Sequence, residues 1–297
     1  MLHKLLTSAM PLVPRFIMRR LANKYIAGES LDEALAELRR QAAAGHPGIF
    51  DILGEGCDSE SHARAAAKAY CEGASAIAAA GLDTYISIKP THMGLDSDEG
   101  LALELYSKVA KHCAELGLFM RVEMEDHPTT DATLRIFEEL RKSFERIGIV
   151  LQSRLFRTPE DIAKLAPGPL DVRLVKGIYL EPASIAHTEY EEIRNAYLAM
   201  TRQLMERGNV KLRFATHDSG MGRDLASLVA VHSVPKDMYE FQVLLGVQEP
   251  LWKEWQEEGH TVRVYVPFGP EWREYSQRRL SRNPELLKAV MRDMLPI

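Results

Sequence analysis

The chain has 297 residues, of which 46% are hydrophobic and 27% charged, as in an ordinary globular protein. Its formal net charge of -5 gives no reason to expect nucleic-acid binding, and no run of about 18 apolar residues predicts a transmembrane helix. Three cysteines, Cys57, Cys71 and Cys113, fit neither a CxxC metal site nor a balanced set of disulfides, so we expect a reducing, cytoplasmic location.

The first segment, residues 1–45, is both basic and apolar, and Pro11 and Pro14 interrupt it. We expect neither a spanning helix nor a cleaved signal here, but helices that pack on the domain formed by residues 46–297. A helix lying on the inner face of a membrane is the alternative, because basic and apolar residues together favour such a surface.

From residue 48 onwards, short apolar runs alternate with helix-length polar segments. The runs cover residues 48–53, 85–88, 119–124, 147–151, 172–175, 212–216, 239–241 and 262–264. Helices are predicted over 59–80, 99–116, 131–142, 189–207 and 271–294, the third of them capped by Thr129, Thr130 or Asp131. Eight strand–helix units of this kind predict an α/β fold, a (βα)₈ barrel of the TIM type.

Polar residues stand at or beside the ends of these eight runs. Barrels of this kind place their active sites where the strands end, so the residues are candidates for one site. Any one of them alone is more often an ion-pair partner, but a ring of eight favours a functional rim. They are Glu55, Lys89, Glu123, Glu125, Gln152, Arg173, Lys176, Thr216, His217, Gln242 and Tyr265.

The last predicted helix carries three arginines beside one tyrosine. Counted from Tyr275, Arg278, Arg279 and Arg282 follow at offsets of three, four and seven, which places all four on one helical face. Guanidinium groups bind carboxylates and phosphates through two parallel hydrogen bonds, so the face predicts anion binding. A solvent-exposed face with local ion pairs is the alternative.

Several common catalytic motifs are absent from the sequence. There is no HExxH motif and no paired histidine spacing that predicts a metal site, and no GxSxG elbow predicts a serine nucleophile. GxGxxG and GxxxxGK[ST] are missing too, so barrel loops would have to hold any nucleotide cofactor. Lys89 or Lys176 could instead form a Schiff base with a carbonyl substrate.

Taken in order, eight motifs resemble those of the proline dehydrogenases, in particular the monofunctional bacterial members. They lie at residues 85–89 with Gly94, 122–126, 150–153, 173–177, 214–218, 240–242 with Leu244 and Gly246, 265–269, and Tyr275 with Arg278 and Arg279. The similarity extends from about residue 25 to residue 297.

The resemblance implies a distorted (βα)₈ barrel with extra N-terminal helices and a C-terminal helix over the active-site face. It implies noncovalently bound FAD and oxidation of L-proline to Δ1-pyrroline-5-carboxylate, with electrons passing to a membrane quinone. Because the sequence shows no second domain, we expect any pyrroline-5-carboxylate dehydrogenase to be a separate chain. The cysteines and the basic first segment lead us to expect a protein that is cytoplasmic or peripheral at the inner face of the membrane.

The resemblance also implies roles for individual residues. Arg278 and Arg279 would clamp the substrate carboxylate, Lys89 would add positive potential, and Tyr265 and Leu244 would shape the pocket around the ring. Glu123 would belong to the catalytic set. Arg173 would lie near flavin N5, and the flavin would be held by Gln152, Lys176, Gly177, Thr216 and His217.

Five positions depart from the family pattern: Pro90, Glu123, Arg154, Ile178 and Arg282. Glu123 stands where aspartate is usual and Ile178 where alanine is usual, so both add bulk near the pocket. Another cyclic amino acid is therefore an alternative substrate. Two other readings stay open, a Schiff-base aldolase or lyase that uses Lys176 or Lys89, and a non-catalytic barrel that serves as a binding subunit.

Overall fold

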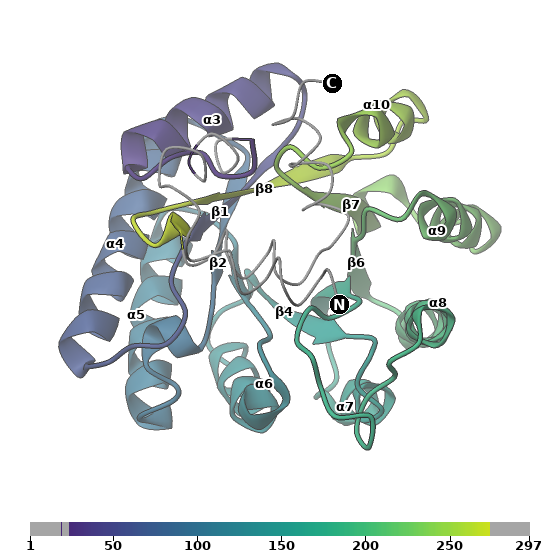
Figure 1. Cartoon of the computed structure of the whole chain (residues 1–297), viewed down its shortest axis with the longest axis horizontal. Coiled ribbons are helices and arrows are strands. Elements are labelled where there is room, and N and C mark those ends of the chain that lie inside the picture. Colours follow the sequence, from purple (N-terminus) through teal and green to yellow (C-terminus); the bar gives the residue numbers. More distant parts are fainter. Residues whose placement is uncertain (1–18, 20–23, 274–297) are drawn as a thin grey trace, which may run out of the picture.

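The computed structural model describes Arg19 and residues 24–273, in which eight parallel strands close into a barrel (Figure 1). Each strand pairs with the next along the chain, and β8 pairs with β1. The predicted (βα)₈ barrel is thereby confirmed. The strands are β1 (Gly48–Ile52), β2 (Thr84–Ile88), β3 (Met120–Val122), β4 (Ile147–Gln152), β5 (Leu170–Val175), β6 (Val210–Ala215), β7 (Tyr239–Leu244) and β8 (Val262–Phe268).

Helices surround the barrel on its outer side (Figure 1). They are α3 (Leu31–Ala43), α4 (Glu60–Ala79), α5 (Glu99–Glu115), α6 (Thr130–Leu140), α7 (Thr158–Lys164), α8 (Tyr190–Arg207), α9 (Ser219–Val231) and α10 (Glu249–Glu257), with short 3₁₀ turns η2 (Thr91–Met93), η3 (His127–Thr129) and η4 (Lys236–Met238). Helix α3 packs against β1 and β8. None of the helices in residues 24–273 combines the length and the apolarity that crossing a membrane requires. The helix predicted over 271–294 lies largely outside the described residues.

Side-chain caps mark where several helices begin. Ser59 caps α4 and Asp98 caps α5, each by accepting hydrogen bonds from backbone N–H groups of the first turn. The cap predicted for α6 is wrong, because no side chain caps that helix. The 3₁₀ turn η3 runs directly into α6, and the Thr129 hydroxyl donates backwards to the carbonyl of Asp126 at 2.8 Å.

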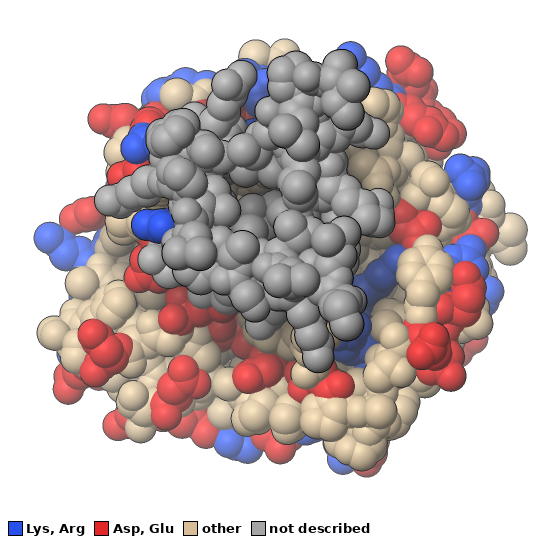
Figure 2. All heavy atoms as spheres, viewed as in Figure 1, with Lys and Arg blue, Asp and Glu red and all other residues tan. Residues whose placement is uncertain are grey.

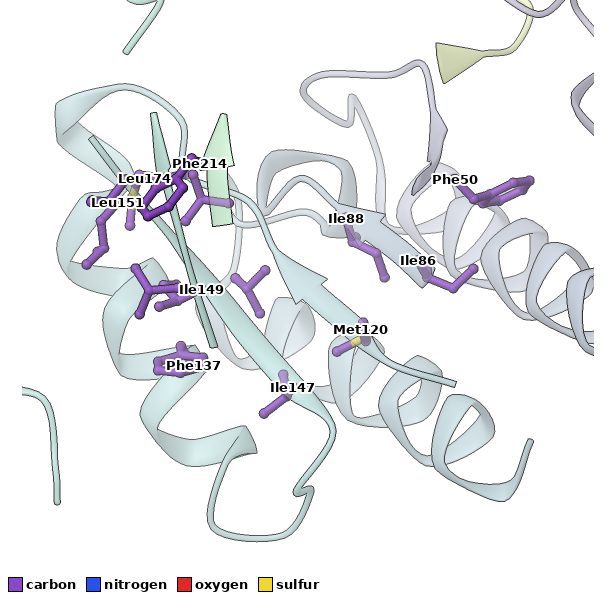
Figure 3. Close-up of a cluster of buried hydrophobic side chains, with 14 of the residues drawn as sticks. Phe50, Ile86, Ile88, Met120, Phe137, Ile147, Ile149, Leu151, Leu174 and Phe214 are labelled. Carbon is purple, nitrogen blue, oxygen red and sulfur yellow. The ribbon is translucent and has the colours of Figure 1, made fainter. Parts of the chain in front are cut away.

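Apolar side chains on the outer face of the strands form a continuous layer against the helices (Figure 3). Phe50 of β1 and Ile86 and Ile88 of β2 are fully buried in it. Burying each such side chain contributes about 1.5–3 kcal/mol. Helix α4 approaches β1 closely through Gly73, where an added Cβ would lie 2.4 Å from the Phe50 ring.

Buried tyrosines connect three helices to the carboxyl ends of strands. The hydroxyl of Tyr70 in α4 donates to the carbonyl of Ile52 at 3.3 Å, and that of Tyr106 in α5 donates to the carbonyl of Ile88 at 2.7 Å. Tyr197 of α8 donates to Leu174 in β5 at 2.8 Å. Since a buried hydroxyl needs a partner, these bonds fix the helices relative to the strand ends where the candidate site lies.

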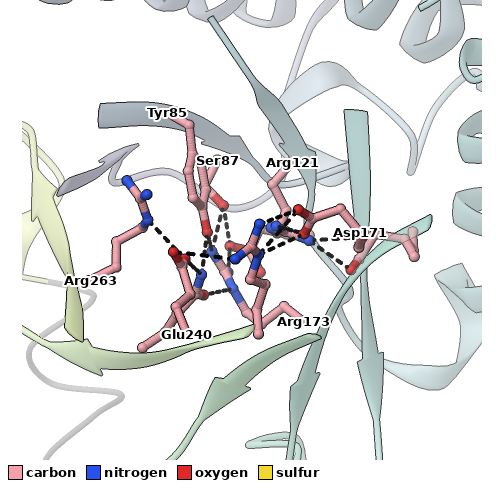
Figure 4. Close-up of polar contacts among 11 residues, drawn as sticks. Tyr85, Ser87, Arg121, Asp171, Arg173, Glu240 and Arg263 are labelled. Atoms are coloured by element: carbon pink, nitrogen blue, oxygen red, sulfur yellow. Dashed lines mark hydrogen bonds and ion pairs between the residues drawn. The ribbon is translucent and has the colours of Figure 1, made fainter. Parts of the chain in front are cut away.

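Ionic side chains fill part of the barrel interior (Figure 4). Interiors of such barrels usually hold branched apolar side chains. Here Asp171 lies between Arg121 and Arg213, and Glu240 lies between Arg213 and Arg263. Three arginines and two carboxylates therefore alternate through five buried or nearly buried side chains, and each carboxylate lies between two guanidinium groups.

Exposed ion pairs join neighbouring helices on the outside. Arg64 of α4 pairs with Glu104 of α5 at 2.7 Å, and Arg135 of α6 pairs with Glu99 of α5 at 2.7 Å. On the face shown in Figure 2, acidic and basic side chains are interspersed around the rim of the molecule. Solvent screens such pairs, so they contribute little to stability compared with the buried layer and the interior network.

Candidate active site

A cavity of about 680 Å³ lies at the carboxyl ends of the strands, where catalytic sites of such barrels are found. Every predicted site residue that the structure describes lines it: Lys89, Glu123, Gln152, Arg173, Lys176, Gly177, Thr216, His217, Leu244 and Tyr265. Arg278 and Arg279 lie outside the described residues. A larger cavity, of about 1260 Å³, opens at the amino ends of the strands, a face that serves stability in these barrels.

Two of the predicted strand-end residues lie inside strands instead. Strand β8 continues through Tyr265 to Phe268, and β7 continues through Gln242 to Leu244. The predicted runs were too short because polar side chains, Gln242 in β7 and Tyr265 in β8, interrupt the apolar pattern. Arg173 lies inside β5, as predicted, two residues after Asp171, so both side chains face the barrel interior. These side chains therefore form the floor of the cavity.

Lys89 and Asp51 form a buried ion pair on this floor. The Lys89 ammonium lies 3.2 and 3.3 Å from the two carboxylate oxygens of Asp51. Burial raises the pKa of Asp51 to about 6, although the Lys89 charge opposes that shift. Burial alone would lower the pKa of Lys89, but the charges of Asp51 and Glu55 outweigh it and hold that pKa above its ordinary value. Lys89 therefore stays protonated, which makes it a poor Schiff-base nucleophile.

Arg173 holds several polar side chains of the floor together. Its Nε donates to the Gln242 side chain at 2.6 Å, one Nη donates to the Tyr85 hydroxyl at 3.0 Å, and the other pairs with Glu123. Its guanidinium also lies over the Tyr265 ring, 5.3 Å from the ring centre. The planar group is thus fixed in one orientation beneath the cavity.

The Glu123 carboxylate is buried and ionised. One of its oxygens accepts hydrogen bonds from Arg173, Ser87 and Tyr265. Burial would raise the pKa of Glu123, but the Arg173 charge and the Ser87 hydroxyl hold it below its ordinary value. The carboxylate and the guanidinium therefore form an ion pair without net charge at the centre of the floor.

A wall formed by β4, β5 and β6 contains a buried hydrogen-bond acceptor, the side-chain oxygen of Gln152. Gln152 donates through Nε2 to the carbonyl of Glu125 at 2.7 Å, but its Oε1 has no hydrogen-bond partner among the described residues. Gly177 lies beside it with φ +97°, and an added Cβ there would lie 2.7 Å from this oxygen. A buried acceptor normally has a donor, so the wall suits a ligand that brings one.

Other residues of this wall are held in place by the protein. Lys176 pairs with Asp218 at 2.7 Å and lies over the ring of Tyr190, 4.5 Å from its centre. The His217 Nε2 accepts the backbone N–H of Leu244 at 3.1 Å. The imidazole therefore connects β6 to the end of β7, and the lysine is positioned at the edge of the cavity.

Asp51 lines the cavity but was not predicted from the sequence. It lies within a run that otherwise consists of apolar residues, which hid it from a search of strand ends. The alternation of side chains along a strand is the signal that could have found it. Asp51 lies between Phe50 and Ile52, whose side chains face outward, so its own side chain faces inward. An acid on the inward face of a barrel strand requires a cationic partner, and Lys89 provides it.

The chain is similar in sequence to known proteins over most of its length. A family model described as proline dehydrogenase matches residues 34–290. A proline dehydrogenase of Deinococcus radiodurans is 35% identical over 283 residues, which cover 94% of this chain and 91% of that protein. Proline dehydrogenase 1 of Bacillus subtilis is 32% identical, and the match covers 92% of this chain and 90% of the relative.

Solved structures show the same fold. Proline utilization A from Bdellovibrio bacteriovorus, in a form inactivated by N-propargylglycine, superimposes with a TM-score of 0.83 at 25% identity. The match covers 94% of this chain but only 34% of that protein, so the chain corresponds to about a third of the larger protein.

Proposed function

The chain belongs to the proline dehydrogenase family, and from this premise we propose that it oxidises L-proline to Δ1-pyrroline-5-carboxylate with FAD as its prosthetic group. The main support is the single cavity that gathers every described residue to which the family resemblance assigns a role. Its charged floor, with Lys89 and Arg173 beside Asp51 and Glu123, suits a small zwitterionic substrate.

The cavity is compatible with a flavin. Its volume of about 680 Å³ is within the usual range for small-molecule sites, about 300–1,000 Å³, and the Gln152 Oε1 offers a buried acceptor to a ligand donor. When bound, the flavin would supply the two-electron oxidant. The residues that would hold it are Gln152, Arg173, Lys176, Gly177, Thr216 and His217.

The substrate would be held by residues that lie far apart in the sequence. Lys89 places a protonated ammonium at the cavity, and Tyr265 and Leu244 offer ring and aliphatic surface to the pyrrolidine ring. Arg278 and Arg279, outside the described residues, would clamp the carboxylate by bidentate hydrogen bonds. Fixing the reacting carbon in one orientation can lower the barrier by about 7 kcal/mol or more.

One spectroscopic experiment tests the proposal. We expect the purified protein to be yellow, with flavin absorbance bands that bleach when L-proline is added in the absence of air. A yellow protein that bleaches only with a different cyclic amino acid would correct the substrate. A colourless protein that traps a carbonyl substrate on borohydride treatment would instead support a Schiff-base enzyme and overturn the proposal.

The carboxylate clamp predicts a specific kinetic change. Replacing Arg278 or Arg279 by methionine should raise KM for proline about tenfold or more, because a hydrogen bond to a charged group contributes about 1.5–3 kcal/mol. Flavin content should stay unchanged. Steady-state kinetics measures the effect, and Arg135→Met, which removes an exposed arginine of α6, is the control. Unchanged KM in both variants would refute the clamp.

We further propose that a membrane quinone takes up the electrons and that a separate pyrroline-5-carboxylate dehydrogenase consumes the product. Both follow from the family resemblance. The reduced protein should then reduce a soluble quinone analogue faster than it reduces oxygen, which stopped-flow absorbance would measure.

A further inference from the structure

The carboxylate of Glu125, just after β3, is buried and binds the neighbouring loop after β2. One oxygen of this group accepts the backbone N–H of Thr91 at 2.8 Å, and the other accepts the Thr91 hydroxyl at 2.8 Å. The backbone carbonyl of Glu125 accepts from Gln152 at 2.7 Å. Glu125 therefore fixes the turn η2, which begins two residues after Lys89, and also contacts the end of β4.

Thr91 passes this constraint to a third loop, residues 53–59, between β1 and α4. Its hydroxyl oxygen accepts the backbone N–H of Gly56 at 2.9 Å. The Cys57 thiol donates to the carbonyl of His92 at 3.2 Å, so η2 holds this loop at two neighbouring points. Glu55, the residue before Gly56, lines the cavity.

We propose that Glu125 is a positioning residue which acts through Thr91 to hold the loop of residues 53–59, and with it Glu55, at the wall of the cavity. The inference rests on the proposed oxidation of proline, and it concerns substrate affinity rather than the chemical step. The structure describes no direct contact between Glu125 and Gly56. The proposal therefore depends on Thr91, which contacts both residues.

The direction of the Thr91 hydroxyl bond makes this connection depend on charge. An ionised Glu125 is only an acceptor, so Thr91 donates to it and keeps its oxygen lone pairs for Gly56. A protonated Glu125 could donate to the same oxygen and compete with the Gly56 N–H. The loop is therefore held best when Glu125 is ionised.

This charge is sensitive to pH near neutrality. Burial raises the pKa of Glu125 to about 7, although the two bonds from Thr91 and the Lys89 charge oppose the shift. Among the described residues, the ionisable groups that interact with it include Lys89, Glu55, and Tyr70 and Tyr106, whose pKa values burial raises well above their ordinary value. Because the ionised form holds the loop, KM for proline should rise as pH falls through about 7, and Glu125→Gln should lack that rise.

Two substitutions test the connection. Thr91→Val removes the hydroxyl with little change of volume, and Glu125→Gln removes the charge. We expect each to raise KM for proline about tenfold while kcat changes less than twofold, and to increase hydrogen–deuterium exchange in residues 53–59. Thr91→Ser, which keeps the hydroxyl, should show the wild-type KM and the wild-type exchange. Thr201→Val, which removes a buried hydroxyl that bonds within α8, is the matched control and should match the wild type.

A double-mutant cycle distinguishes positioning from general destabilisation. If Thr91 acts through the loop that carries Glu55, Thr91→Val should add little to the KM of Glu55→Gln. Fully additive KM changes, or unchanged exchange in residues 53–59, would overturn the proposal. A wild-type protein that does not oxidise proline would instead refute the proposed function, and the exchange measurement would still test the connection through Thr91.

Discussion

Replacing Asp171 by asparagine is expected to destabilise the folded barrel by about 3 kcal/mol or more. Asp171 is almost fully buried and neutralises both Arg121, which is wholly buried, and Arg213 (Figure 4). Removing one member of a buried ionic network leaves charge without compensation, which costs about 3–5 kcal/mol in measured cases. Arg213 keeps a weaker contact with Glu240 at 3.4 Å, which places the expected value at the lower end. Urea unfolding would measure the free-energy difference.

An exposed pair provides the matched control. Glu99 in α5 binds Arg135 through two hydrogen bonds of 2.7 and 2.9 Å, a geometry as good as that of the interior network. Both side chains are exposed, at 42% and 62%, so Glu99→Gln should cost less than about 1 kcal/mol. Equal effects of the two substitutions would show that burial does not strengthen the interior network.

The effect of Asp171→Asn should also depend on pH. Burial would raise the pKa of Asp171, but the charges of Arg121 and Arg213 hold it below its ordinary value of about 3.9. A carboxylate with a lowered pKa stabilises the fold fully above that ordinary value and loses this contribution as pH falls through the folded pKa. The difference between wild type and variant should therefore be constant near neutral pH and shrink below about pH 4.

The barrel could be predicted because its strands are buried on both faces. Side chains such as Phe50, Ile86 and Ile149 face the helices, and short β-branched or aromatic runs separated by helix-length segments leave few other folds. The same rule placed the cavity, since parallel strands bring their carboxyl ends to one edge. Lys89, Gln152 and Lys176 were found in this way.

The features that were not predicted from the sequence share one physical cause, the polar and charged side chains inside the barrel. Tyr265 interrupts the apolar pattern of β8, so that strand was predicted to end at Val264, whereas the structure has Val262–Phe268. Asp51 was missed because it is a single charged residue within an otherwise apolar run. Pairing across the barrel, such as that of Arg173 with residues of β2 and β7 and with Glu123 just after β3, joins positions far apart in the chain and leaves no local signature in the sequence.

The largest kinetic effect is expected for Arg173→Met, with kcat/KM for proline reduced by about 10³-fold. Arg173 is a buried cation of the cavity floor, and a fixed charge beneath the reacting groups stabilises charge that develops in the transition state. Losing one such preorganised group costs about 10²–10³ in rate in measured cases, and Arg173 also orients Glu123 and Gln242. Steady-state kinetics and anaerobic flavin reduction would measure the loss.

A second substitution separates the catalytic loss from loss of folding. Without Arg173, the Glu123 carboxylate would be buried beside Ser87 and Tyr265 without its main cation, so its pKa should rise and the fold should weaken. Adding Glu123→Gln removes that unpaired charge and should recover much of the stability, measured by urea unfolding. Activity should stay low, because the guanidinium is still missing. If the double variant regains activity along with stability, Arg173 serves the fold rather than the reaction. A third variant, Arg173→Lys, keeps the positive charge but not the planar guanidinium. Low activity of that variant would show that the planar group is required as well as the charge.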